Sequence, residues 1–287
     1  MLSQVCYRHP DRPTALSCTR CGRSACPECL RPASVGQHCV DCVAQAQAAQ
    51  RATTPAPTVA RRAMQPVVTY TLIAINVVVF ASVMLQAGGS DLRYSSIYQH
   101  TVLVNGAGFE NQYWRLLTSG FLHQSLPHLA INMFSLYIIG ADLERALGRA
   151  RYLAIYLVGL LGGSAAVMAL QSGVSLTAGA SGAIYGLMGA LLVILLKMKA
   201  PVTTVVVVIV INLVFSFTVP NISIFAHLGG LVFGAASAGA VIWLPTVVLA
   251  PDKRTQAAVD RIGWYGLIAL AVVALAIGAG IGLGVSV

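Results

Sequence analysis

The chain consists of a polar amino-terminal stretch followed by a series of long apolar segments. From Pro66 onward, apolar runs of about 20 residues alternate with short polar breaks, which is the pattern of membrane-crossing helices. The runs are too long and continuous for strands, and glycine occurs throughout them, as it does in membrane helices. The pattern predicts seven spans, at approximately residues 67–86, 128–147, 152–171, 180–197, 202–219, 222–244 and 264–285.

Composition agrees with this all-α polytopic membrane fold. Of the 287 residues, 57% are hydrophobic and 9% are charged, whereas a soluble domain carries about 25% charged residues. Residues 1–43 form a small module rich in cysteine, and residues 44–65 form an Ala/Gln/Thr/Pro-rich linker, helical at first and loose around its prolines. The amino terminus has no basic-then-apolar pattern, so we expect no cleavable signal peptide.

The basic residues indicate an orientation. If all seven spans cross, most of the basic residues between spans lie on one side, whereas the opposite side carries only Arg93 and Arg115. The basic set is Arg61, Arg62, Arg145, Arg149, Arg151, Lys197, Lys199, Lys253, Arg254 and Arg261. Basic loops stay in the cytoplasm, so we expect a cytoplasmic N-terminus and an outside C-terminus. The asymmetry also accounts for most of the net charge of +9 without nucleic acid.

Four polar side chains stand near the outer ends of three apolar spans. They are His128 and Asn132 on the second span, Ser181 on the fourth and His227 on the sixth. At about 1.5 Å per residue, Ser181 lies about 24 Å and His227 about 27 Å from the other ends of their helices. The two side chains can therefore meet at one level. Because a serine becomes a nucleophile beside a base, usually histidine, we hypothesise a Ser181–His227 dyad.

Small residues at four-residue spacing on the fourth and sixth spans allow their backbones to approach closely. The alternative interpretation is that these small residues serve helix packing alone. No acid completes a triad, since Asp142 and Glu144 lie at the far end of their span. His128 and Asn132 are four residues apart and share a helix face. They could act with the Ser181 backbone N–H as oxyanion donors, although His128 alone also suits a hydrogen bond to a loop carbonyl.

Several motifs resemble those of rhomboid intramembrane serine proteases. The stretch GASGAIYG (179–186) matches their G-x-S-G-x-x-Y-G, and HLAIN (128–132) matches their H-x-x-x-N. The stretch AHLGGLVFG (226–234) is similar to their A-H-x-x-G-x-x-x-G, and GADLERALG (140–148) to their G-x-x-x-E-x-x-x-G. Trp114 and Arg115 match the Trp-Arg pair of their first loop. The resemblance covers about residues 66–245.

The resemblance implies a six-helix catalytic core over 66–245, followed by a cytoplasmic loop and one further transmembrane helix over 246–287. Ser181 would attack a peptide bond, with His227 as base and Tyr185 stacked beside it, and His128 and Asn132 would stabilise the oxyanion. Substrates would be single-span proteins of the lipid bilayer, cut in or near their transmembrane segments. We expect Gly179 and Gly182 to allow the backbone to turn tightly and to pack closely at the start of the fourth span, which exposes Ser181 to a water-filled pocket open to the outside.

The seven cysteines all lie between Cys6 and Cys42, and each is separated by two residues from another cysteine or, for Cys6, from a histidine. Such pairs are typical of zinc sites, and a disulfide scaffold is disfavoured in the reducing cytoplasm. Eight ligands suit two tetrahedral structural sites, and the metal would supply folding energy to a segment with little apolar content. The pairs are Cys6–His9, Cys18–Cys21, Cys26–Cys29 and Cys39–Cys42, with His38 beside the last.

The spacing resembles that of B-box-type zinc fingers, whose ligand pairs alternate between two sites. The resemblance implies one Zn²⁺ ion on Cys6, His9, Cys26 and Cys29. It implies a second on Cys18, Cys21, Cys42 and either Cys39 or His38. We expect the finger to bind a protein partner or to regulate the protease, and we expect no nucleic acid as a partner.

The sequence therefore predicts an intramembrane serine endopeptidase. A bacterial cytoplasmic membrane is expected from the Gly/Ala/Val/Arg-rich composition. The alternative is a catalytically inactive rhomboid-fold protein that binds membrane clients. A transporter would need internal repeats or broken helices in corresponding halves, and the sequence has neither.

Overall fold

The computed structural model describes residues 4–53, 65–89, 91–105, 112–218 and 222–284. It divides the chain into two compact units, Met1–Met64 and Gln65–Val287. Residues 54–64, which include the second half of the predicted linker with Arg61 and Arg62, lie outside the described residues. The first half of that linker belongs to helix α1 (Val40–Thr53), which begins inside the predicted cysteine module.

The first unit is built from short hairpins around its cysteines. Strand β1 pairs antiparallel with β2, and β3 pairs antiparallel with β4. These elements are β1 (Val5–Cys6), β2 (His9–Pro13), the 3-10 turn η1 (Pro27–Cys29), β3 (Leu30–Pro32) and β4 (Gln37–Cys39). Its buried core consists of six of the seven cysteines with Ala25 and Leu30. A core of this kind buries little hydrocarbon, which is typical of small modules whose folding is coupled to metal binding.

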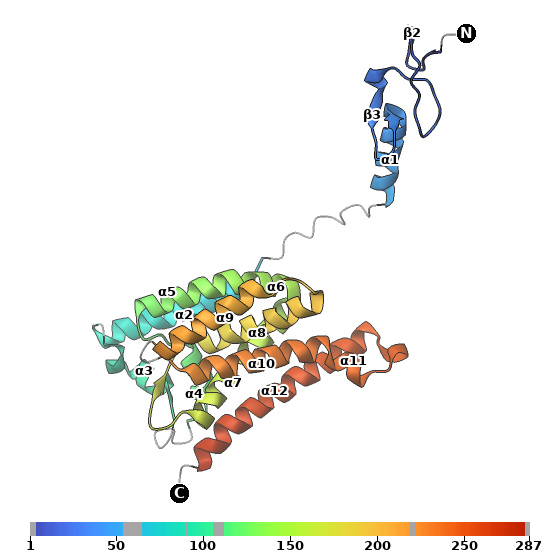
Figure 1. The fold of residues 1–287 in the computed structure, drawn as a ribbon. Helices are drawn as coiled ribbons and strands as arrows, with labels where there is room; N and C mark the ends of the chain where they lie inside the picture. Colours follow the sequence, from blue (N-terminus) through green and yellow to red (C-terminus); the bar gives the residue numbers. More distant parts are fainter. Residues whose placement is uncertain (1–3, 54–64, 90, 106–111, 219–221, 285–287) are drawn as a thin grey trace. The chain divides into compact units, whose positions relative to one another are not determined.

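The second unit is a bundle of apolar helices (Figure 1). Its long helices are α2 (Val67–Ala87), α5 (Leu126–Ser135), η5 (Leu136–Gly140), α6 (Ala141–Leu147), α7 (Arg149–Leu170), α8 (Ser181–Met198), α9 (Thr203–Thr218), α10 (Ile224–Ile242) and α12 (Gln256–Gly284). Helices α5, η5 and α6 are continuous, with one π-helical turn at η5, and together form one span. The shorter elements are η2 (Leu92–Tyr94), α3 (Ser96–Thr101), β5 (Leu103–Val104), α4 (Arg115–Thr118), η4 (Ser119–Phe121), β6 (Leu176–Thr177), α11 (Leu244–Val248) and η6 (Pro251–Lys253).

Within the described residues, six helices are long and apolar enough to cross a membrane. They correspond to six of the seven segments in the hydropathy pattern. The remaining segment forms α9, an apolar helix of 16 residues. At a rise of about 1.5 Å per residue it is about 24 Å long, shorter than a bilayer core of about 30 Å.

The last helix begins earlier than the sequence predicts. Hydropathy places its start at residue 264, whereas α12 begins at Gln256. The added turns contain Asp260 and Arg261, which lower the local hydropathy without interrupting the helix. An ion pair between Asp260 and Arg151 on α7 neutralises one of these charges and joins the two helices.

Helices α7, α8 and α10 form the centre of the bundle. They pack against one another over most of their length, and α12 lies against α7 and α10 (Figure 1). Helix α9 contacts α8 and α10 over a smaller surface. Small residues on the central helices allow this close packing. The closest packing is therefore between α8 and α10, the helices that carry Ser181 and His227.

The loop after α2 is fixed by hydrogen bonds from the Trp-Arg pair. The indole N–H of Trp114 donates to the carbonyl of His100 at 2.8 Å. The guanidinium of Arg115, which is buried, donates to the carbonyls of Gln99 and Val102 at 2.7 and 2.6 Å. These bonds attach α3 to α4. The pair therefore organises the loop and does not line either of the two larger cavities described below.

Glu144 of α6 stabilises the start of the first membrane helix. Its carboxylate is fully buried and accepts from the backbone N–H groups of Val68 and Thr69 at 3.0 and 2.8 Å. It also accepts from the Thr69 hydroxyl at 2.8 Å. An anion is stabilised at a helix N-terminus by the unpaired N–H groups and the helix dipole. This contact joins α6 to α2.

Candidate active site and metal clusters

Three helices begin close to the candidate catalytic side chains. Ser125 caps α5 by accepting from the backbone N–H of His128 at 3.3 Å, and Ser223 caps α10 by accepting from that of Ala226 at 3.2 Å. Ser181 is the first residue of α8. Serine is favoured at N-caps because its hydroxyl satisfies an otherwise unpaired N–H. His128, Ser181 and His227 therefore all lie in the first turns of their helices.

Ser181 and His227 are in hydrogen-bond contact. Nε2 of His227 lies 2.8 Å from Oγ of Ser181, although the residues are 46 positions apart. The imidazole stacks on the ring of Tyr185 with 4.1 Å between centroids and an interplanar angle of 14°. Tyr185 lies one helical turn after Ser181, so α8 supplies both the hydroxyl and the surface on which the histidine rests.

The other imidazole nitrogen contacts a residue that the sequence analysis did not single out. Nδ1 of His227 lies 2.6 Å from Oγ of Ser216 on α9. The Ser216 hydroxyl is buried and lies 2.7 Å from the carbonyl of Asn212, to which it donates. Serine is common in membrane helices, so sequence alone gave no reason to select Ser216.

These side chains line a cavity of about 310 Å³. His128, Asn132, Ser181, Tyr185 and His227 all contribute to its wall, so the predicted site residues from three helices face one space. The amide nitrogen of Asn132 donates to the carbonyl of His128 at 2.9 Å. An amide NH₂ carries two hydrogens, so this bond uses one of them. Among the described residues that form this wall, none has an acidic side chain.

The turn before α8 requires glycine at position 179. Gly179 has a φ of 141°, which L-residues rarely adopt. A Cβ at this position would lie 3.0 Å from Nε2 of His128 and 3.6 Å from Oγ of Ser181. Glycine therefore leaves open a point close to both groups. Gly182 instead faces Gly163 and Ala226, so it serves the packing of α8 against α7 and α10.

His123 is a second buried residue that the sequence analysis missed. It packs edge-on against His128, with ring centroids 5.1 Å apart and an interplanar angle of 65°. Within the described residues neither of its ring nitrogens has a hydrogen-bond partner. Its position five residues before His128 was the available signal. Its ring limits the rotation of the His128 side chain.

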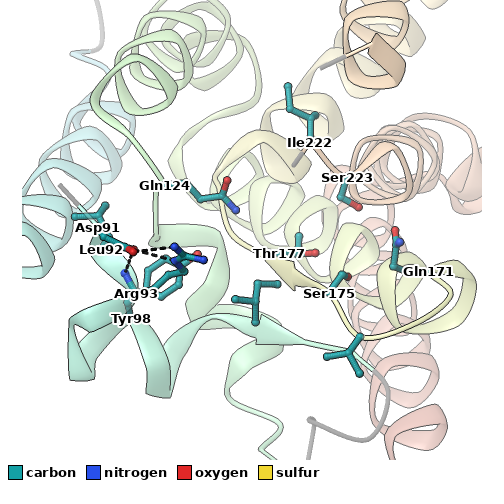
Figure 2. A pocket seen from close by; sticks show the side chains of 12 residues that line it. Asp91, Leu92, Arg93, Tyr98, Gln124, Gln171, Ser175, Thr177, Ile222 and Ser223 are labelled. Atoms are coloured by element: carbon teal, nitrogen blue, oxygen red, sulfur yellow. Dashed lines mark hydrogen bonds and ion pairs between the residues drawn. The ribbon is translucent and has the colours of Figure 1, made fainter. Parts of the chain in front are cut away.

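A larger cavity of about 690 Å³ adjoins the first, and the two share Gln124, Thr177, Ile222 and Ser223 in their walls. Figure 2 shows Asp91 and Arg93 on one side of it and Ser223 on the other. Arg93 donates to both carboxylate oxygens of Asp91, at 2.9 and 2.8 Å. This hydrogen bonding holds the pKa of Asp91 below its usual value, so the pair is ionised at neutral pH.

The first unit contains two clusters of metal-ligand type. One consists of Cys6, His9, Cys26 and Cys29, and the other of Cys18, Cys21, Cys39 and Cys42. Within each cluster the candidate ligand atoms all lie within 4.8 Å of one another. Nδ1 of His9 lies 3.7, 3.5 and 3.4 Å from the sulfurs of Cys6, Cys26 and Cys29. Ligands at about 2.1–2.3 Å around a tetrahedral ion lie about 3.5–3.8 Å apart, so the residues fit such an ion.

The second cluster contains Cys39, and His38 is not among its members. The reason lies in strand β4, where successive side chains point to opposite faces. Cys39 pairs with Leu30 in the β3–β4 hairpin and is fully buried, whereas His38 pairs with Arg31 and is half-buried. Both clusters thus have four ligand atoms and could each bind one metal ion.

Comparison with known proteins identifies the second unit. Residues 110–244 match the rhomboid domain. The chain is 36% identical over 214 residues to rhomboid protease GluP of Bacillus subtilis, covering 71% of this chain and 41% of GluP. It is 30% identical over 177 residues to the putative rhomboid protease YdcA of the same organism, covering 60% of this chain and 86% of YdcA. RHOMBOID-like protein 6 of Arabidopsis thaliana is 41% identical over 131 residues, covering 43% of this chain and 42% of that protein.

The chain thus spans about two fifths of the length of GluP and of the Arabidopsis protein. YdcA, in contrast, is covered over most of its length at 30% identity. The motifs, the apolar helices long enough to span a membrane and these similarities agree with one another. The chain is therefore a multi-pass membrane protein and belongs to the rhomboid family.

Proposed function

We propose that this protein is an intramembrane serine endopeptidase with a Ser181–His227 dyad. The observation that carries the proposal is the 2.8 Å contact between Oγ of Ser181 and Nε2 of His227 at the wall of a cavity. A serine beside a base is the arrangement required for nucleophilic catalysis. Relatives named rhomboid protease support the same reaction class.

In the proposed reaction, Ser181 Oγ attacks the carbonyl carbon of a peptide bond while its proton passes to Nε2 of His227. The imidazolium then donates that proton to the leaving amine, and a water molecule hydrolyses the acyl-enzyme by the same steps in reverse. Stacking on Tyr185 keeps the imidazole plane fixed through both proton transfers. The cavity supplies the space for water that a lipid environment would exclude.

The oxyanion would form in the space that Gly179 leaves open. A point at the position of a Cβ on residue 179 is 3.0 Å from Nε2 of His128 and 3.6 Å from Oγ of Ser181. A reacting atom near both nucleophile and donor is the geometry that oxyanion stabilisation requires. The second amide hydrogen of Asn132 and the backbone N–H of Ser181 are the further donors we propose.

We propose single-span membrane proteins as substrates, cut in or near the transmembrane segment. The catalytic cavity would take the scissile bond. The adjoining cavity of about 690 Å³, with polar groups including Ser175, Thr177 and the Asp91–Arg93 pair (Figure 2), would take the polar residues that flank such a segment. Charged and hydroxyl groups replace part of the hydration that those residues lose.

For the first unit we propose two structural Zn²⁺ ions. The Cys₃His and Cys₄ donor sets suit zinc, and most of the ligands are buried with no position left for a substrate. Zinc bound there would supply folding free energy to a unit whose core is mostly cysteine. We also propose that this unit binds a protein partner or regulates the protease.

We further propose a bacterial cytoplasmic membrane as the location, with the N-terminus inside. The basic residues at the start of α7 and at the end of α8, including Arg149 and Lys197, would face the cytoplasm. Arg93 would face outside. A membrane-impermeant thiol reagent should label an Arg93→Cys variant in intact cells. The native cysteines would not react, because the first unit would lie in the cytoplasm. Protection of that position would reverse the orientation.

The decisive experiment for the enzymatic proposal uses the full chain reconstituted in lipid with a model single-span substrate. Wild type should yield two fragments, and Ser181→Ala and His227→Ala should yield none above background. Equal product from wild type and Ser181→Ala would point to a contaminant and favour the client-binding alternative.

A further inference from the structure

The further inference concerns Ser216, which contacts the imidazole of His227 on the side opposite Ser181. We propose that Ser216 is a positioning residue that fixes the tautomer of His227 through a chain of hydrogen bonds from α9, called the relay below. This proposal rests on the Ser181–His227 dyad proposed above. The relay runs from Ser181 to His227, from His227 to Ser216, and from Ser216 to the carbonyl of Asn212.

The assignment of hydrogens follows from counting donors. A serine hydroxyl has one proton, and Ser216 Oγ lies 2.7 Å from the Asn212 carbonyl and 2.6 Å from Nδ1 of His227. If the proton points to the carbonyl, Ser216 Oγ must accept, so Nδ1 carries hydrogen. Nε2 is then free to accept the proton of Ser181, 2.8 Å away. Every hydrogen in the chain of contacts is used.

The opposite tautomer leaves the site incomplete. With hydrogen on Nε2, the imidazole would donate to Ser181 and could not accept its proton, and Ser216 would have to turn its hydroxyl away from Asn212. Ser216 and His227 are both buried, and leaving a hydrogen-bonding group of a buried side chain unsatisfied costs free energy. The geometry therefore favours the tautomer that activates Ser181.

Ser216 also remains a suitable partner during the reaction. When the proton of Ser181 reaches Nε2, the imidazolium has hydrogen on both nitrogens, and the Nδ1 hydrogen still faces the Ser216 oxygen. Ser216 neither gains nor loses a proton in any step. It acts through His227 and is distinct from the groups that touch the substrate.

The test combines kinetics with a direct measurement of the tautomer. Ser216→Ala should lower kcat by about 10- to 100-fold, the range for one hydrogen bond to a charged group, with KM nearly unchanged. Ser216→Thr keeps the hydroxyl and should restore most of the rate. The matched control is Ser237→Ala on α10, because Ser237 is also buried and donates to the carbonyl four residues earlier, Phe233, at 2.7 Å. Its kcat should equal that of wild type.

Nitrogen-15 NMR of histidine-labelled full chain in lipid measures the tautomer without substrate. The six histidines give separate signals, and a His227→Gln variant identifies the relevant one. Wild type at neutral pH should carry hydrogen on Nδ1, and Ser216→Ala should show a mixture of tautomers. Hydrogen on Nε2 in wild type, or an unchanged tautomer and rate in Ser216→Ala, would overturn the relay.

The two proposals fail in different ways. Cleavage that survives Ser181→Ala would remove the proposed function, whereas the NMR result would still report the His227 tautomer. Cleavage that depends on Ser181 but is unaffected by Ser216→Ala would remove only the relay. Loss of activity in Ser216→Ala without recovery in a folded Ser216→Thr would also count against it.

Discussion

The contact between α8 and α10 determines the distance between Ser181 and His227, and Gly230 is the residue at which this dependence can be tested. Gly230 lies three residues after His227 on α10. A Cβ at this position would lie 2.0 Å from the carbonyl oxygen of Gly182, the residue after Ser181. Ordinary contacts begin at 3.4 Å, so Gly230→Ala must move the two backbones apart by about 1.4 Å.

A shift of this size changes the contact between Ser181 and His227 directly. The 2.8 Å separation of Ser181 Oγ and His227 Nε2 would approach about 4 Å, beyond hydrogen-bond range. A misplacement of about 1 Å costs about 100-fold in rate, so kcat should fall by about that factor. Overpacking should also lower the free energy of unfolding by about 1–3 kcal/mol, which leaves most of the protein folded if the bundle is of ordinary stability.

The assay measures cleavage of a single-span substrate in lipid, with thermal unfolding of each variant in parallel. Gly239→Ala is the matched control, because it lies on the same helix and its Cβ would meet the Trp243 ring at 3.5 Å, an ordinary contact. The control should keep wild-type kcat. A folded Gly230→Ala variant with wild-type kcat, or an equal loss in Gly239→Ala, would refute the dependence on helix separation.

Three further predictions concern other parts of the molecule. Asn132→Ala should lower kcat by about 100-fold through loss of an oxyanion donor while Tm stays near wild type; an unchanged rate would contradict that role. Glu144→Gln should lower the free energy of unfolding by about 2–3 kcal/mol, because the carboxylate accepts three hydrogen bonds at the start of α2. Metal analysis should give two zinc ions per wild-type chain and one for Cys18→Ser, and a wild-type value of one or none would refute two sites.

Much of the fold could be predicted because membrane helices follow simple rules. Apolar length gave the position of six of the spans to within a few residues at most ends, since a helix has to satisfy its own backbone in lipid. The constant helix rise predicted that Ser181 and His227 lie at one level. The start of α12 was missed because Asp260 lowers the hydropathy there. Its ion pair with Arg151 joins residues far apart in the sequence, so a mean hydropathy over neighbouring residues does not include it.

Contacts within one helix follow from sequence spacing, whereas contacts between helices could be predicted only where helix rise places both residues at one level, as for Ser181 and His227. His128 and Asn132, or Ser181 and Tyr185, are related by helical spacing. Ser216 is different, because its contact with His227 depends on how α9 is rotated against α10, and α9 presents several hydroxyl and amide side chains. Hydropathy does not encode that rotation. Hydropathy likewise does not indicate whether Cys39 or His38 belongs to the second cluster, because that depends on how β3 and β4 pair.

A hydroxyl at position 216 suits this site better than an acid would. Ser216 is 5% exposed on an apolar helix, where desolvating a carboxylate costs several kcal/mol. A serine hydroxyl donates its hydrogen to the carbonyl four residues earlier, and its oxygen still accepts a hydrogen bond from Nδ1 of His227. We therefore expect Ser216→Asp to lower Tm and to leave kcat below wild type, as thermal unfolding and cleavage in lipid would measure. A stable Ser216→Asp variant with higher kcat would mean that the site tolerates charge and that desolvation does not explain the absence of an acid from the cavity wall described above.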